Sequence, residues 1–253
     1  MIQLSCTLVS EGSSDAALIP ILVWLLGQHG MLPVRRIARY DPAVFRRPPK
    51  ALADRLDHAI QNFPCDLLFV HRDGDAAGLA AREAEIQEAL EASRAAGIGR
   101  PPVVSVIPIR MMEAWLLFDE KSIRFAAGSP RGRNRLDLPA LFACETLSDP
   151  KALLHRCLLA ATGKSGRHLR RFNTGTAIHR VAELIPDYSP LRGLTAFERL
   201  ESNLDGGLRS YCRRSRSKVI PMKPRHISSS VPSPQVTSLS GLFGLRGFES
   251  ELL

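Results

Sequence analysis

The chain has 253 residues, of which 45% are hydrophobic and 23% charged, and its formal net charge is +9. This length and composition are typical of a globular protein with a sizeable core, and they exclude wholesale disorder, collagen-like repeats and a coiled coil. The five cysteines are odd in number and never spaced C-x-x-C, which favours reduced thiols in a cytoplasmic protein over a zinc ribbon. The longest apolar run, residues 16–27, is too short for a membrane span, and the first residues lack the basic lead-in of a secretory signal.

The excess positive charge is concentrated near the C-terminus. From Arg209 onward the chain has eight Lys and Arg residues and two Glu, so this segment holds six of the nine net charges. It is rich in Ser, Pro and Arg and poor in periodic apolar residues, which predicts a disordered basic tail over residues 209–253. Such a tail is either an electrostatic arm for nucleic acid or an extension without a specific role.

Short apolar segments alternate with helical patterns over the first 120 residues. Strands are expected at residues 3–10, 33–40, 65–71 and 103–109. Helices are expected at residues 16–26, 50–63, 76–96 and 111–118. This alternation predicts an α/β fold with a mostly parallel four-stranded sheet flanked by helices.

The pattern divides the chain into three parts. Residues 1–120 are expected to form the α/β domain. Residues 121–208 lack strand patterns and are expected to form a helical lobe that covers one edge of the sheet. Within this lobe, helices are predicted at residues 150–161, 176–185 and 190–204. The tail, residues 209–253, follows.

Acidic residues stand where three of the predicted strands end. Glu11 follows the first strand, Asp73 and Asp75 follow the third, and Glu113 lies just past the fourth. The carboxyl ends of parallel strands share one edge of a sheet, where ligands bind. Carboxylates gathered there would repel each other unless a cation neutralises them, and oxygen ligands without a Cys or His cluster suit Mg²⁺ or Mn²⁺. Each acid alone could be a turn, cap or surface residue, but their joint placement predicts a metal site.

The segments around these acids resemble those of a known superfamily. Residues 8–15, LVSEGSSD, and 68–75, LFVHRDGD, are similar to the Glu and Asp-x-Asp motifs of the Toprim fold, which topoisomerases, bacterial primases and OLD-type nucleases share. Residues 107–119, IPIRMMEAWLLFD, resemble the Glu-Ala-Trp-Leu-Leu-x-Asp signature of a bacterial family of Toprim-like proteins, some of them linked to mobile elements and phage defence. Residues 149–151, DPK, also resemble that family. The likeness spans roughly residues 4–205.

The resemblance implies roles for the acidic residues. Glu11 would act as general acid or base and as a metal ligand, Asp73 and Asp75 would hold the metal, and Glu113 would complete or adjoin the site. Lys151 is a second candidate catalytic residue, because its position matches the family. The basic residues expected to contact nucleic acid are Arg72, Arg110, Lys164 and Arg167.

These features favour a Mg²⁺-dependent or Mn²⁺-dependent nuclease that hydrolyses phosphodiester bonds in DNA or RNA. The resemblance also implies a role in a defence or mobile-element system, and it leaves open whether a partner ATPase or defence-system protein is needed. One alternative is a non-catalytic Toprim-fold subunit that binds nucleic acid or regulates a partner. A minor alternative is a metal-dependent phosphatase or nucleotidyl transferase. A topoisomerase is disfavoured because the chain has no further domain to supply a tyrosine nucleophile.

Overall fold

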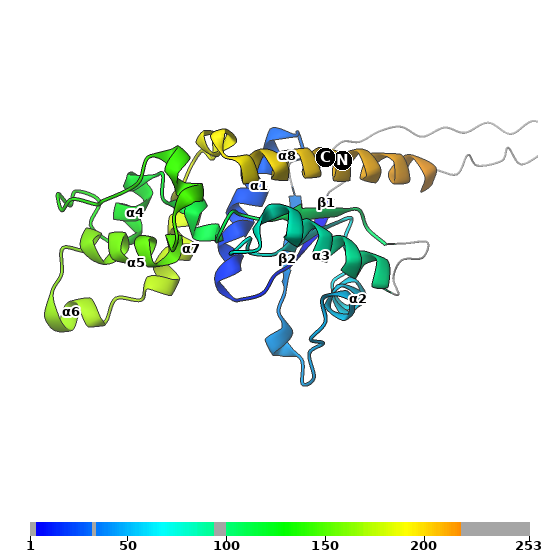
Figure 1. Ribbon diagram of the computed structural model, residues 1–253, viewed down its shortest axis with the longest axis horizontal. Coiled ribbons are helices and arrows are strands. Elements are labelled where there is room, and N and C mark those ends of the chain that lie inside the picture. The colour runs from blue at the N-terminus through cyan, green and yellow to red at the C-terminus, as the bar shows by residue number, and fades with distance from the viewer. Residues whose placement is uncertain (1–3, 32–33, 94–99, 219–253) are drawn as a thin grey trace, which may run out of the picture. The chain divides into compact units, whose positions relative to one another are not determined.

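The protein is described by a computed structural model over residues 4–31, 34–93 and 100–218 (Figure 1). Its sheet has four strands in the order β2-β1-β3-β4, and each neighbouring pair is parallel. The strands are β1 (Leu4–Val9), β2 (Val34–Tyr40), β3 (Leu67–His71) and β4 (Val103–Val106). The predicted α/β fold with a four-stranded parallel sheet and flanking helices is therefore confirmed.

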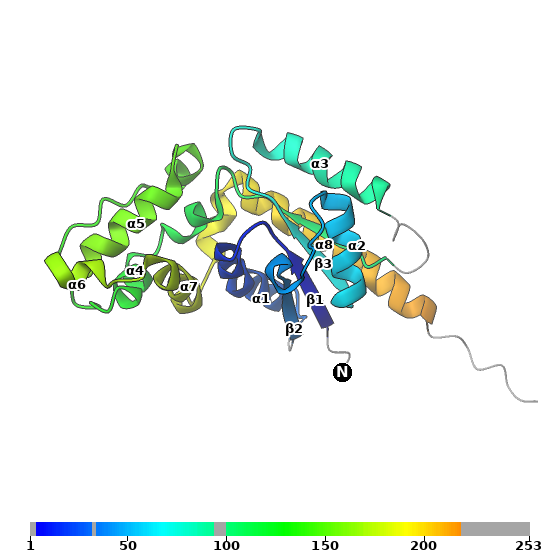
Figure 2. The same cartoon turned by 90° about the horizontal axis from the view of Figure 1, so that it is seen from below.

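Helices cover both faces of the sheet (Figure 2). Two of them, α1 (Leu18–Gln28) and α8 (Thr195–Lys218), pack on one face, and α2 (Leu52–Asn62) and α3 (Gly78–Ala92) pack on the other. Side chains alternate along each strand. In β3, Leu67 and Phe69 join the core beneath α1, whereas Leu68 and Val70 join the core beneath α2 and α3. A strand buried on both faces is a continuous apolar run, which is why the sequence pattern located β3.

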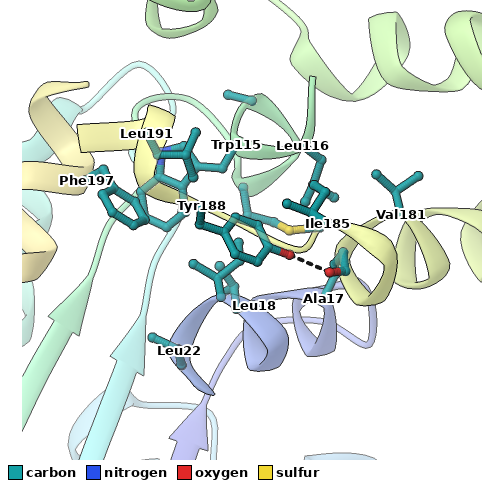
Figure 3. Packing of buried hydrophobic residues seen from close by; sticks show 14 of the residues in the cluster. Ala17, Leu18, Leu22, Trp115, Leu116, Val181, Ile185, Tyr188, Leu191 and Phe197 are labelled. Atoms are coloured by element: carbon teal, nitrogen blue, oxygen red, sulfur yellow. Dashed lines mark hydrogen bonds between the residues drawn. The ribbon is translucent and has the colours of Figure 1, made fainter. Parts of the chain in front are cut away.

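The residues between β4 and α8 form a helical lobe. Its elements are the 3₁₀ turns η4 (Met112–Leu116), η5 (Leu141–Thr146) and η6 (Ser189–Gly193) and the helices α4 (Glu120–Ala126), α5 (Pro150–Ala161), α6 (Gly166–Arg170) and α7 (Thr174–Leu184). The lobe shares its core with the sheet, because α7 packs against η1 (Ser14–Ala17) and α1. Trp115, Tyr188 and Phe197 are fully buried at this junction, with the Trp115 and Phe197 ring centroids 5.5 Å apart (Figure 3).

The segment after β4 differs from the prediction. The strand ends at Val106 rather than at residue 109, and the helix expected at 111–118 is the 3₁₀ turn η4. Pro108 cannot donate a hydrogen bond to a neighbouring strand, and Arg110 has a φ of 66°, which lies in the left-handed region. The chain therefore leaves the sheet early and turns sharply before η4.

The last described helix also differs from the prediction. Residues 209–218 were expected in the disordered tail but continue α8, so that the helix ends at Lys218. Leu200, Leu204 and Leu208 are buried and Tyr211 packs against the same core, so an apolar stripe at helical spacing runs through the basic segment. Residues up to Lys218 form one compact unit, within which the expected boundary at residue 120 lies. The rest of the predicted tail lies outside the described residues.

The helices and the cysteines bear on two general properties of the chain. Among the described residues, no helix is long and apolar enough to cross a membrane. The five cysteines are free thiols, and three of them are buried. Burial raises the pKa of Cys6 to about 12, so this thiol is chemically inert at neutral pH.

Candidate active site

The loops that follow β3 and β4 are joined at the carboxyl edge of the sheet. The backbone amide of Gly74 donates to the carbonyl of Pro108 at 3.0 Å, and the amide of Asp75 donates to the carbonyl of Arg110 at 3.0 Å. A Cβ atom on Gly74 would lie 2.8 Å from the Pro108 carbonyl oxygen, so only glycine allows this close approach. Asp75 and Arg110 both have positive φ values, 44° and 66°, which mark a strained backbone on both loops.

The loop after β1 is closed by a buried aspartate that the sequence analysis did not assign to the site. Asp15 in η1 is only 5% exposed. Its Oδ2 atom accepts hydrogen bonds from the backbone amides of Glu11 at 3.0 Å and Gly12 at 2.8 Å. Asp15 therefore fixes the backbone that carries Glu11 and adds a further negative charge beneath the edge of the sheet.

Two of the predicted ligands, Asp73 and Glu113, influence each other electrostatically. Glu113 in η4 is 3% exposed, and its burial raises its pKa above the ordinary value. The Lys151 ammonium group offsets part of this effect, while the negative charges of Asp73 and Asp15 raise the pKa further. The end of β3 and the turn after β4 thus bring acidic side chains into one electrostatically coupled group.

His71, the last residue of β3, lies beneath these carboxylates and is fully buried. Its Nδ1 atom is 2.9 Å from the carbonyl oxygen of Val106, and its Nε2 atom lies 3.4 Å from Asp73 Oδ1 and 3.9 Å from Asp15 Oδ2. Burial alone would lower the pKa of His71, but Asp73 and Asp15 outweigh it and raise the pKa. Because both ring nitrogens face acceptor oxygens, the imidazole is stabilised in its cationic form.

Lys151 reaches the site from the helical lobe. The Asp149 side chain caps α5 by accepting a hydrogen bond from the Ala152 amide at 2.8 Å, and Pro150 occupies the first turn. This start of the helix places the Lys151 ammonium nitrogen 3.6 Å from Glu113 Oε1. The DPK segment that resembled a family motif is thus a helix start that brings a cation to a buried carboxylate.

The other two predicted ligands, Glu11 and Asp75, belong to a network with arginines. Arg72 forms an ion pair with Glu11 and a second one, at 2.7 Å, with Glu85 on α3. Arg82 continues the network, with contacts of 2.7 Å to Glu85 and 3.3 Å to Asp75. The Arg82 Nε atom also donates to the backbone carbonyl of Asp73 at 2.9 Å.

Each predicted metal ligand therefore lies beside a basic side chain. Arg72 neighbours Glu11, Arg82 neighbours Asp75, His71 neighbours Asp73, and Lys151 neighbours Glu113. No group of three His, Cys, Asp or Glu side chains within residues 4–31, 34–93 and 100–218 is arranged to hold a metal ion in this state. The repulsion between the carboxylates is relieved by the protein's own cations.

One feature of the donor set nevertheless fits a bound cation. Asp73 Oδ1 is buried and makes no hydrogen bond of ordinary geometry; its neighbour is His71 Nε2 at 3.4 Å, so this oxygen retains capacity for a further ligand. The available donors, Asp73, Glu113, Glu11 and Asp75, are all carboxylates, which are hard oxygen ligands of the kind that Mg²⁺ and Mn²⁺ prefer. Asp73 and Glu113 already interact electrostatically, whereas Glu11 and Asp75 would have to exchange their arginine partners.

The predicted basic residues fall into two groups. Arg72 and Arg110 lie at the edge of the sheet, where Arg72 contacts Glu11 and the Arg110 backbone supports Asp75. Lys164 and Arg167 are exposed near α6 and are not part of this edge.

Four residues of the site were missed by the sequence analysis: Asp15, His71, Arg82 and Glu85. A signal existed for the first two only, since both stand inside the quoted motif segments.

Comparisons of the chain with protein-family models, curated proteins and solved structures found no match. The likeness to Toprim-type enzymes stays a prediction from sequence motifs. Function must therefore be inferred from the site itself.

Proposed function

We propose that the carboxyl edge of the sheet is the active site of a Toprim-like nuclease that hydrolyses phosphodiester bonds in DNA or RNA with the help of Mg²⁺ or Mn²⁺. The observation that carries this proposal is a group of carboxylates at this edge: Asp73 and Asp15 both face His71 Nε2, at 3.4 and 3.9 Å, and both raise the pKa of the buried Glu113. Gathering carboxylates in a largely buried place is unfavourable, and such arrangements are concentrated at sites where a cation or a reaction uses them.

Asp73 and Glu113 would hold the metal first, and Glu11 and Asp75 would join after release from Arg72 and Arg82. A divalent ion at this place supplies charge stabilisation on phosphate oxygens and a more acidic bound water. The chain's own residues have separate tasks. His71 and Asp15 fix the orientation of Asp73 and of the loop that carries Glu11. Glu11 is the candidate general acid or base, because its side chain is 38% exposed and can reach a substrate.

The arginines and Lys151 are suited to the substrate rather than to the metal. Arg72 and Arg82 are held in place by Glu85, so their guanidinium groups are positioned before a phosphate arrives. When Glu11 and Asp75 turn to a metal, these guanidinium groups become free to neutralise phosphate oxygens. Lys151 is 46% exposed and can contact a phosphate near Glu113.

The same ion pairs favour a second candidate function. Because Arg72 and Arg82 already neutralise Glu11 and Asp75, the site is stable without a metal and could serve a subunit that binds nucleic acid without cutting it. The expected partner ATPase or defence-system protein stays a prediction for either function.

The deciding experiment uses the purified full chain with labelled single-stranded and double-stranded DNA and RNA in Mg²⁺, Mn²⁺ or EDTA. We expect metal-dependent cutting by the wild type, loss of cutting in Asp73→Asn, and normal cutting in the control Asp137→Asn, whose side chain is exposed and pairs with Arg135. Binding without cutting in every metal would favour the non-catalytic subunit. Faster hydrolysis of a phosphomonoester than of a phosphodiester would favour a phosphatase, and full activity of Asp73→Asn would overturn the assignment of the site.

A further inference from the structure

We infer that the helical lobe holds a second nucleic-acid site, which binds the phosphate backbone away from the edge of the sheet. This site is a recess of about 450 Å³ next to α6 and α7, called here the α6–α7 recess. The residues that line it are Ala126, Lys164, His168, Arg171, Phe172, Asn173, Thr176, Ala177 and Arg180. The inference rests on the proposed function and adds a second place, away from the reacting phosphodiester, at which the protein holds its substrate.

All the charged side chains that line the recess are basic. Lys164, Arg171, Arg180 and His168 are exposed and line it, and it has no acidic lining residue. Along the chain, the stretch between Asp149 and Glu183 contains no Asp or Glu at all. The recess therefore carries a positive potential that its own residues do not neutralise.

This arrangement contrasts with that of the basic residues at the edge of the sheet. There, Arg72 and Arg82 are each paired with carboxylates. Within the described residues, none of the four basic side chains of the recess takes part in an ion pair. Like charges gathered in a hollow repel each other, and binding an anion removes that cost.

The other lining residues suit a nucleotide better than a simple inorganic anion. Phe172 is partly exposed in the recess, and an aromatic ring can stack on a base while Lys and Arg hold the adjoining phosphates. The exposed Thr176 can supply a hydroxyl donor to a phosphate or sugar oxygen. A volume of about 450 Å³ lies within the usual range for sites that hold small organic groups, about 300–1,000 Å³.

The local backbone explains how these residues come together. Gly163, with a φ of 62°, ends α5 in the left-handed conformation, and Gly166, with a φ of 54°, opens α6. The chain turns twice within four residues and then enters α7 at Thr174. Residues of the α5–α6 turn and of α6 thereby line the same recess as Arg180 on α7.

The position of the recess sets a requirement on the substrate. Lys151 lies at the start of α5, next to Glu113, and Lys164 follows the end of the same helix (Figure 1). Twelve residues of α-helix span about 18 Å, which corresponds to about five nucleotides at 3.4 Å each. A substrate that contacts both places at once must therefore be at least about five nucleotides long, and a trinucleotide in the active site cannot reach the recess.

Binding in EDTA tests the recess independently of cleavage. We would measure the anisotropy of labelled 20-nucleotide DNA and RNA, single-stranded and double-stranded, with the variant Arg171→Ala/Arg180→Ala. Its matched control is Arg46→Ala/Arg47→Ala, which removes the same charge from an exposed loop on the sheet side of the protein. We expect at least tenfold weaker binding and a salt slope smaller by about 1.4–1.8 in the recess variant, and at most a twofold effect in the control. Both side chains in the recess variant are exposed, so thermal melting should show an unchanged fold.

Cleavage as a function of length separates the recess from the active site. With a 20-nucleotide substrate the recess variant should raise KM without lowering kcat, whereas a three-nucleotide substrate should be cut equally by variant and wild type. If the recess variant binds more weakly but neither it nor the wild type cuts any substrate, the nucleic-acid site in the recess stands and the proposed nuclease function is wrong. If the recess variant has the same affinity and KM as the wild type, the nucleic-acid site in the recess is wrong and the proposed function is unaffected. An equal loss of affinity for heparin would show a general polyanion surface and overturn the assignment to nucleic acid.

Discussion

The Lys151 ammonium nitrogen lies 3.6 Å from the carboxylate oxygen of Glu113, which joins the start of α5 to the turn after β4. Glu113 is 3% exposed, whereas Lys151 is 46% exposed. A buried carboxylate thus depends on a cation that is itself in contact with solvent. A metal ion could take the place of Lys151 beside Glu113 from the solvent side, which would leave the ammonium group free to contact a phosphate.

Substitutions of the two residues of this pair should have opposite effects on stability: Glu113→Gln should stabilise the protein and Lys151→Gln should destabilise it. Burial raises the pKa of Glu113, so its charged form destabilises the fold above that pKa, and Glu113→Gln removes the cost. We expect Glu113→Gln to raise Tm at pH 8 by a few degrees and to abolish metal-dependent cutting, because in a domain of this size each kcal/mol corresponds to about 2–4 °C.

Lys151→Gln should lower Tm under the same conditions, because it leaves Glu113 charged without its partner. The measurement is thermal unfolding in EDTA. A less stable Glu113→Gln variant would show that the carboxylate supports the fold and is not held at a cost for function.

Removal of the Arg72 charge should strengthen the binding of metal and weaken the binding of nucleic acid. Arg72 neutralises Glu11, so Arg72→Gln removes a positive charge that competes with a cation for this carboxylate. We expect Mn²⁺ to bind several-fold more tightly and nucleic acid to bind more weakly in EDTA. Titration of Mn²⁺ and nucleic-acid anisotropy check the two effects, with exposed Arg36→Gln as the control. Weaker Mn²⁺ binding would mean that Arg72 does not compete for the metal ligands.

Gly74 should be essential for the joined loops. A Cβ atom there would lie 2.8 Å from the Pro108 carbonyl oxygen and 3.4 Å from the Arg110 amide nitrogen, and backbone atoms of this kind cannot move aside cheaply. We expect Gly74→Ala to cost about 1–3 kcal/mol in unfolding free energy and most of the activity. The control Gly193→Ala meets no atom within 4 Å and should leave both unchanged. Chemical denaturation with parallel cleavage assays would show this, and normal activity of Gly74→Ala would exclude the tight joining of the loops.

Two adjacent glycines in α8 test how the helix packs on the sheet. A Cβ atom on Gly207 would lie 2.7 Å from Val104 Cγ2 and 3.2 Å from Leu67 Cδ1, whereas one on Gly206 meets nothing within 4 Å. We expect Gly207→Ala to destabilise the protein by about 1 kcal/mol or more and Gly206→Ala to stabilise it by about 0.5–1 kcal/mol. Urea unfolding of both variants gives the comparison, and equal effects would contradict the close contact of α8 with β3 and β4.

The third strand was predictable because it is buried on both faces, which leaves the uninterrupted apolar run of residues 67–70. The convergence of the strand ends then follows from parallel topology, and the coupling of Asp73 with Glu113 agrees with it. The extent of α8 was not predictable in the same way. Its apolar stripe, which continues to Tyr211, is diluted by arginines that face outward.

The ion-pair partners of the site residues could not be predicted from the sequence. Nothing in the spacing of Glu85, fourteen residues after His71, indicates that it holds Arg72 and Arg82, because this depends on where α3 passes the edge of the sheet. From sequence alone, a metal ion was expected to relieve the repulsion between the carboxylates. In the structure, basic side chains supplied by β3, α3 and α5 relieve it instead, which only the packing of these elements could show.

The most direct test of the metal site is a crystal structure of the full chain soaked with Mn²⁺ and recorded at the manganese absorption edge. An anomalous peak at bonding distance from the carboxylates of Asp73 and Glu113, with Arg72 turned away from Glu11, is the result that we predict. A map without such a peak, in which Arg72 stays paired with Glu11 and Arg82 with Asp75 at saturating Mn²⁺, would contradict the metal-dependent nuclease.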